Sequence, residues 1–124
     1  MKKVLSLVCL LAIVASCLFV FASCGATPNA DANAAKEKLE ANGYTVRDIT
    51  TGAATMFTGC KAAFIATNKN DSADIAEFYY FSNEEHAQAG FETIEALAEG
   101  SNASVSISGC VVFAGSSDAI KATN

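Results

Sequence analysis

The chain is short of the residues on which most catalytic and nucleic-acid sites depend. It has one histidine, His86, and none of the H-x-x-x-H, H-E-x-x-H or G-x-S-x-G patterns that hold a metal or a nucleophile. Its eight Lys and Arg residues do not cluster, which argues against nucleic acids as partners. No C-x-x-C pair is present to support thiol redox chemistry. We therefore expect no enzyme activity, no cofactor and no metal site.

Charge is distributed unevenly along the chain. Lys2 and Lys3 are followed by an uncharged, mostly apolar run from Val4 to Ser23, and all thirteen acidic residues come after it. A positive start followed by an apolar stretch is typical of a secretory signal. The run also reaches the ~20 residues that can cross a bilayer. Three interpretations follow: an uncleaved anchor helix, a plain signal peptide, or a signal whose processing depends on Cys24.

The stretch "VFASCG", Val20 to Gly25, marks the end of the apolar run. It resembles the lipobox of bacterial lipoproteins, in which an apolar residue and two small residues precede a cysteine. The resemblance covers only about the first 25 residues. It implies cleavage recognition by Phe21, Ala22 and Ser23, and attachment of a diacylglyceryl group, with fatty chains such as palmitate, to Cys24. Phe21 departs from the usual Leu, and a second match ending at Cys17 is followed by further apolar residues.

Processing before Cys24 would leave an acidic chain. Without residues 1–23, six basic and thirteen acidic residues remain, a net charge of −7. Anionic lipid headgroups repel such a chain, so we expect membrane contact to run through the lipidated Cys24. Two acyl chains suffice for stable anchoring, whereas one binds only marginally. Residues 24–31, which contain the only proline of the chain, are predicted to form a flexible tether, and residues 32–124 a single domain.

The remaining chain predicts a small α+β domain with a mostly antiparallel sheet and the element order α-β-β-β-α-β-β-α. Periodic apolar residues and end signals indicate longer helices over 29–43 and 82–100, the first capped by Asn29 or Asp31. Residues 61–67 and 74–81 are expected to pair as a hairpin, as are the strands on either side of Ser108-Gly109. Residues 51–59 are interpreted as a loop or a short helical turn. We expect both longer helices to pack on one face of the sheet.

Several side chains of the domain have two interpretations. Cys60 and Cys110 could form a disulfide, which an extracytoplasmic compartment allows, or remain buried thiols. The strand over 74–81 has aromatic residues on both faces, a hint that one face is incompletely covered and binds a ligand. His86 and the glutamates of its helix are most simply interpreted as a solvated face.

These patterns predict a lipoprotein of the bacterial cell envelope, made with a signal peptide and anchored to the membrane outside the cytoplasm. We expect a small binding or interaction module whose ligand or protein partner the sequence does not specify. The alternatives are a small cell-surface enzyme or accessory subunit, in which His86 would meet carboxylates from other elements, and a structural envelope protein without a ligand.

Overall fold

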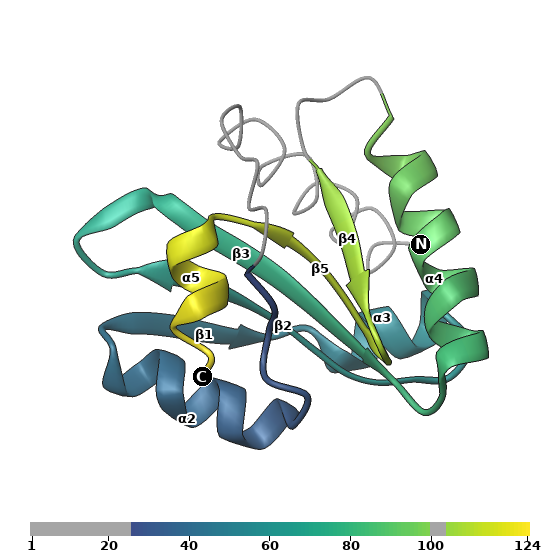
Figure 1. Cartoon of the computed structure of the whole chain (residues 1–124), viewed down its shortest axis with the longest axis horizontal. Coiled ribbons are helices and arrows are strands. Elements are labelled where there is room, and N and C mark those ends of the chain that lie inside the picture. Colours follow the sequence, from purple (N-terminus) through teal and green to yellow (C-terminus); the bar gives the residue numbers. More distant parts are fainter. Residues whose placement is uncertain (1–25, 100–103) are drawn as a thin grey trace.

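The computed structural model describes residues 26–99 and 104–124, which form one sheet with helices on both sides (Figure 1). The predicted signal peptide, its recognition residues Phe21, Ala22 and Ser23, and Cys24 lie outside the described residues. The elements in chain order are α2 (Ala32–Ala41), β1 (Tyr44–Asp48), α3 (Thr50–Met56), β2 (Cys60–Asn68), β3 (Asp71–Phe81), α4 (Glu84–Leu97), β4 (Val105–Ser108), β5 (Val111–Gly115) and α5 (Ser117–Lys121).

The five described strands form one antiparallel sheet in the order β1-β2-β3-β5-β4. The predicted α+β class, the antiparallel sheet and both predicted hairpins, β2–β3 and β4–β5, are confirmed. The element order differs from the predicted one by the short helix α3, which occupies the ambiguous stretch after β1.

Strand β3 is the centre of the sheet and is buried on both faces. Its residues from Ile75 to Phe81 are all buried. Because successive side chains of a strand point to opposite faces, Phe78 and Tyr80 enter one apolar cluster, and Tyr79 and Phe81 enter the other. The expectation that one face of this strand is uncovered is therefore wrong.

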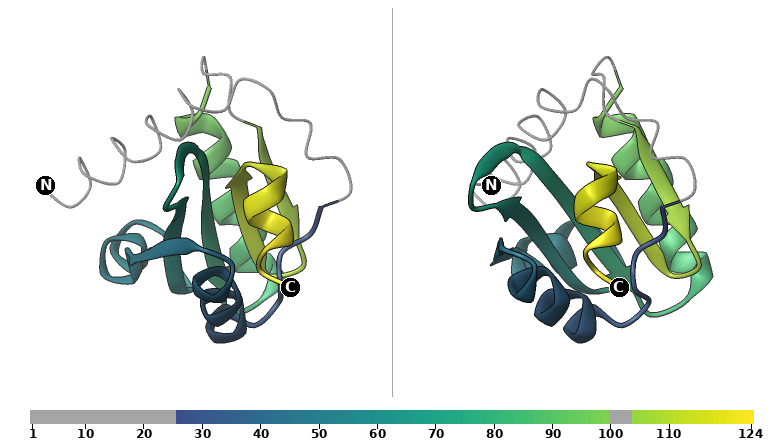
Figure 2. Two further views of the ribbon diagram at one scale, coloured as in Figure 1. Left: turned by 90° about the vertical axis from the view of Figure 1, so that its left-hand side faces the viewer. Right: turned by 60° about the vertical axis from the view of Figure 1, so that its left-hand side comes forward.

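The helices divide between the two faces of the sheet, which corrects the prediction that both longer helices share one face. Leu39 of α2 and Ile120 of α5 pack in the cluster that contains Phe78. Ala53 of α3 and Ile94 of α4 pack in the cluster that contains Tyr79. Two apolar faces on one central strand each need a cover, and the two longer helices supply one each. The three views of Figures 1 and 2 show α5 and α4 on different sides of the strands.

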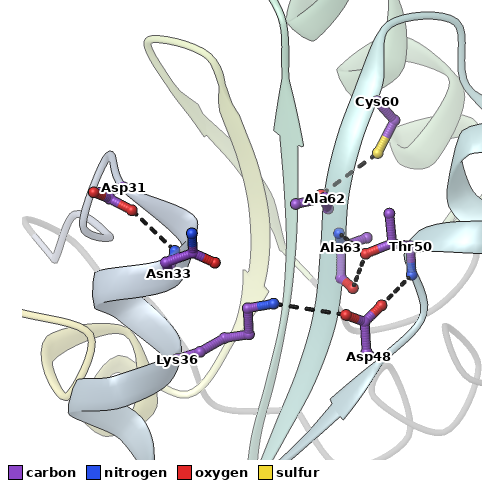
Figure 3. Close-up of polar contacts among 8 residues, drawn as sticks. All are labelled: Asp31, Asn33, Lys36, Asp48, Thr50, Cys60, Ala62 and Ala63. Carbon is purple, nitrogen blue, oxygen red and sulfur yellow. Dashed lines mark hydrogen bonds and ion pairs between the residues drawn. The ribbon is translucent and has the colours of Figure 1, made fainter.

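Helix α2 is fixed at its start by a cap and along its length by a contact to β1. The Asp31 carboxylate accepts hydrogen bonds from the backbone N–H groups of Asn33 and Ala34, so it is the cap. Lys36 reaches from α2 to Asp48 at the end of β1, with 3.6 Å between Nζ and Oδ2 (Figure 3). Hydrogen bonding from Thr50 holds the pKa of Asp48 below its usual range. This partly exposed ion pair contributes at most about 1 kcal/mol.

Residues 26–31 belong to the folded domain, which corrects the prediction that they are part of a flexible tether. Asn29 donates hydrogen bonds from its backbone N–H to Thr123 Oγ1 (2.9 Å) and from Nδ2 to the Thr123 carbonyl (3.2 Å). Its own carbonyl accepts from the Tyr80 hydroxyl at 2.7 Å. Ala26 and Pro28 are buried. Figure 2 shows this dark blue segment beside the C-terminal end of the chain.

Gly115 lets β5 approach β3, and its replacement tests this packing. Its φ is +140°, and a Cβ there would lie 2.3 Å from the Ala76 Cα. We expect Gly115→Ala to lower the free energy of unfolding by about 2–4 kcal/mol, because backbone strain and overlap add. Gly52→Ala is the control: it lies in α3 with no atom within 4 Å of the added Cβ. It should stabilise the protein by about 0.5–1 kcal/mol. Urea unfolding measures both variants, and equal effects of Gly115→Ala and Gly52→Ala would contradict the close packing of β5 against β3.

Candidate functional site

The described residues contain no arrangement typical of a metal centre or a membrane span. In residues 26–99 and 104–124, no three His, Cys, Asp or Glu side chains gather closely enough to hold a metal ion. No helix in the same part of the chain is long and apolar enough to cross a membrane. The search for a site therefore turns to individual polar groups held inside the domain.

His86 does not assemble a catalytic group with its neighbours in the described structure. It lies in the first turn of α4, half-buried, and its ring covers the backbone of Gly59 so closely that a Cβ there would lie 2.5 Å from the His86 Cγ. The helix cap is Asn83, whose side-chain oxygen accepts from the His86 backbone N–H at 2.8 Å. The position of the ring thus has a packing explanation.

Cys60 and Cys110 are free thiols on either side of Phe81. Cys60 is the β2 partner of Phe81, and the Cys110 carbonyl accepts the Phe81 backbone N–H from the other side at 2.8 Å. Two strand spacings, about 9–10 Å, therefore separate the cysteines, which exceeds the ~7 Å that a disulfide allows between Cα atoms. Of the two sequence alternatives, the structure shows the free thiols.

Burial makes the Cys60 thiol a poor nucleophile. It raises the pKa of this thiol to about 11, well above neutral pH, so the reactive thiolate is scarce. Its Sγ contacts the Ala62 carbonyl at 3.6 Å (Figure 3). Cys60 therefore acts as a small apolar side chain of the core.

Asp74 joins four elements through one half-buried carboxylate. Its Oδ2 accepts hydrogen bonds from the Tyr44 hydroxyl (2.5 Å) and from Asn68 Nδ2 (3.0 Å), at the ends of β1 and β2. Its Oδ1 accepts from the hydroxyl of Ser116, which in turn caps α5 by accepting from the Ala119 backbone N–H at 3.0 Å. Burial raises the pKa of Tyr44, and the neighbouring Asp74 carboxylate raises it further. All three donors to Asp74 are side chains of the domain itself, so the cluster holds β1, β2, β3 and the start of α5 together. We call it the structural clamp.

Glu77 and Tyr79 form the most unusual polar feature of the described residues. Both lie on the α3/α4 face of β3, Glu77 with 0% and Tyr79 with 1% of its surface exposed. Neither Glu77 carboxyl oxygen has a partner at hydrogen-bond geometry, and the same is true of the Tyr79 hydroxyl, although the two groups lie close enough to influence each other's pKa. An unpaired buried carboxylate is so costly that such a group takes up a proton instead. Burial accordingly raises the pKa of Glu77 to about 8.

The surroundings of Glu77 are apolar. Its neighbours across the sheet are Ile65 on β2 and Ala114 on β5, both buried. None of these three side chains belongs to either apolar cluster of the described residues. Burial also raises the pKa of Tyr79, and the nearby Glu77 adds to the effect. Chemically, this row offers a neutral carboxylic acid and a phenol, both able to donate and accept hydrogen bonds.

Sequence reasoning did not single out Glu77. The available signal is an acidic residue within the apolar part of a strand, Ile75 to Phe81, whose apolar side chains occupy both faces, so that no solvated face is left for it. The aromatic residues of the strand over 74–81, for which the sequence suggested an uncovered binding face, do not gather in one groove: Phe78 and Tyr80 lie on one face and Tyr79 and Phe81 on the other.

Comparisons with protein-family models, with curated proteins and with solved structures find no match to this chain. The function must therefore be argued from the residues themselves.

Replacing Asp74 tests the clamp. We expect Asp74→Asn to lower the free energy of unfolding by about 2–4 kcal/mol, because three donors lose a charged acceptor and the new amide group opposes them. The matched control is Asp71→Asn, the exposed first residue of the same strand, expected to change stability by less than about 0.5 kcal/mol. Chemical denaturation at neutral pH measures both variants, and equal midpoints for them would show that the clamp contributes nothing.

Glu77 should make the domain more stable in mild acid than at neutral pH. In the folded domain the carboxyl keeps its proton up to about pH 8. In the unfolded chain it loses the proton near its ordinary value of 4.5. Between these values the folded state binds more protons, so stability falls as pH rises, by up to about 1.4 kcal/mol per pH unit.

Glu77→Gln removes this titration. Its free energy of unfolding should therefore stay nearly constant from about pH 5 to about pH 8, the range between the pKa of Glu77 in the unfolded chain and in the folded domain. Glu95→Gln, on the exposed surface of α4, should leave the wild-type slope unchanged. Urea unfolding at several pH values measures both. A wild-type slope that persists in Glu77→Gln would assign the effect to other groups.

Proposed function

We propose that the protein is a lipid-anchored module of the bacterial cell envelope, held outside the cytoplasm through Cys24. Its folded domain binds a partner. The proposal rests mainly on the short distance in sequence between the end of the apolar leader and the start of the folded domain. The lipobox-like "VFASCG" ends an apolar run, and the first buried residue of the domain, Ala26, follows Cys24 by two positions. A diacylglyceryl group on Cys24 would supply the two acyl chains that stable anchoring needs.

The charge of the domain supports an anchor of this kind. An acidic chain gains nothing from anionic lipid headgroups, so a covalent lipid is the attachment that suits it. The binding role is supported by α4, which carries four glutamates and no Lys or Arg on the outer side of one sheet face. Such a surface attracts basic partners over a range of about 8 Å at physiological salt.

The anchor is tested by replacing Cys24 with alanine in the bacterial host. We expect wild-type protein to carry the added mass of a diacylglyceryl group and to lack residues 1–23, whereas Cys24→Ala carries no lipid and keeps the leader, whose apolar run can itself hold the protein in the membrane. Intact-mass spectrometry measures both the lipid and the leader.

Cys17→Ala is the matched control, since Cys17 ends the second small-residue match in the leader. It should keep both the lipid and the leader cleavage of wild type. The proposal is overturned if wild-type protein carries no lipid, or if Cys17→Ala, and not Cys24→Ala, abolishes the modification.

A further inference from the structure

The first residues of the domain leave almost no free chain between the anchor and the fold. Ala26 is 9% exposed, and Thr27 accepts a hydrogen bond at its carbonyl from Asn124 Nδ2 at 2.8 Å. Asn29 is held by three hydrogen bonds to Thr123 and Tyr80. Two residues span at most about 7 Å, so a lipid attached to Cys24 would be joined to the docked segment by no more than that length of chain.

The docked segment belongs to one particular side of the molecule. Ala26 packs in the apolar cluster built by α2, α5 and the Phe78 face of the sheet. Helices α3 and α4 cover the opposite face. Each helix layer is about 10 Å thick, and the sheet lies between them. A lipid on Cys24 therefore emerges beside the α2/α5 face.

The two faces also differ in charge. Helix α2 has two lysines and two glutamates, and α5 has one aspartate and one lysine, so each is neutral over its own residues; the exposed Asp31 cap adds one negative charge at the start of α2. Helix α4 has four glutamates and no basic residue. Anionic headgroups would therefore repel α4 more strongly than α2 or α5. Charge and chain length favour the same orientation independently.

We propose that the lipidated protein lies close against the bilayer surface with the α2/α5 face and the docked residues 26–29 toward the headgroups, and that it presents the acidic α3/α4 face outward to its partner. This inference rests on the proposed anchoring through Cys24. It adds that the anchor orients the domain as well as retaining it.

Tryptophan fluorescence can test the orientation, because the chain contains no tryptophan. Lys121→Trp places a reporter on the exposed surface of α5, and Glu95→Trp places one on the exposed surface of α4. Each lipidated protein is reconstituted in phosphatidylcholine vesicles that contain a lipid with a nitroxide quencher on its headgroup. We expect quenching of the Lys121→Trp reporter to be several-fold stronger than quenching of the Glu95→Trp reporter.

Two further variants show whether the short, docked connection causes the difference. A flexible Gly-Ser spacer inserted between Gly25 and Ala26 should reduce quenching at position 121 toward that at position 95. Thr123→Val removes the hydroxyl that accepts from the Asn29 backbone N–H and should reduce it in the same direction, with circular dichroism showing that the domain is folded.

Intact-mass measurement of each reconstituted sample separates the possible failures. Absence of the lipid mass overturns the proposed anchoring itself. Presence of the lipid mass with equal quenching at positions 95 and 121, or with quenching that the spacer does not change, overturns the orientation alone.

Discussion

Strand β3 is buried on both faces, and the arrangement of the domain follows from that constraint. A strand at the centre of a five-stranded sheet has no solvated side when helices pack on both faces. Its aromatic side chains divide between α2 and α5 on one face and α3 and α4 on the other. The same constraint buries the Glu77 carboxyl completely, and it accounts for the close approach of β5 at Gly115. The burial of β3 on both faces therefore explains both the packing of the helices and the raised pKa of Glu77.

The local elements could be predicted from the sequence because their signals are local. Alternating apolar residues and the Ser108-Gly109 turn indicated the hairpins, and Asp31 was among the caps expected for α2. The assignment of helices to faces could not be predicted in this way, since a strand that is apolar on both faces accepts a helix on either. Helix α3 was ambiguous because a short segment with an internal glycine and only one buried residue, Ala53, has little periodicity.

The candidate sites were harder to predict than the fold. Asp74 collects donors from positions up to 42 residues away in the sequence, and Asn29 bonds to Thr123 across 94 residues. Small polar residues such as "GATPNAD" give no sign of such long-range contacts, so the segment resembled a free tether. The lipid-anchor prediction rests on residues outside the described structure and stays a prediction. The structure shows that the described chain enters the fold at Ala26, in the apolar cluster of α2 and α5.

The central claim is that the fold begins at Ala26, two residues after the cysteine proposed to carry the anchor, so that the docked residues 26–29 leave little free chain before the domain. Hydrogen–deuterium exchange of the membrane-bound protein tests this most directly at the Asn29 backbone N–H, which donates to Thr123 Oγ1. The account predicts that this amide is protected to the same degree as amides of α2, whose start it precedes. Exchange at the rate of an unstructured peptide, with α2 still protected, would contradict the account and restore a flexible tether between lipid and domain.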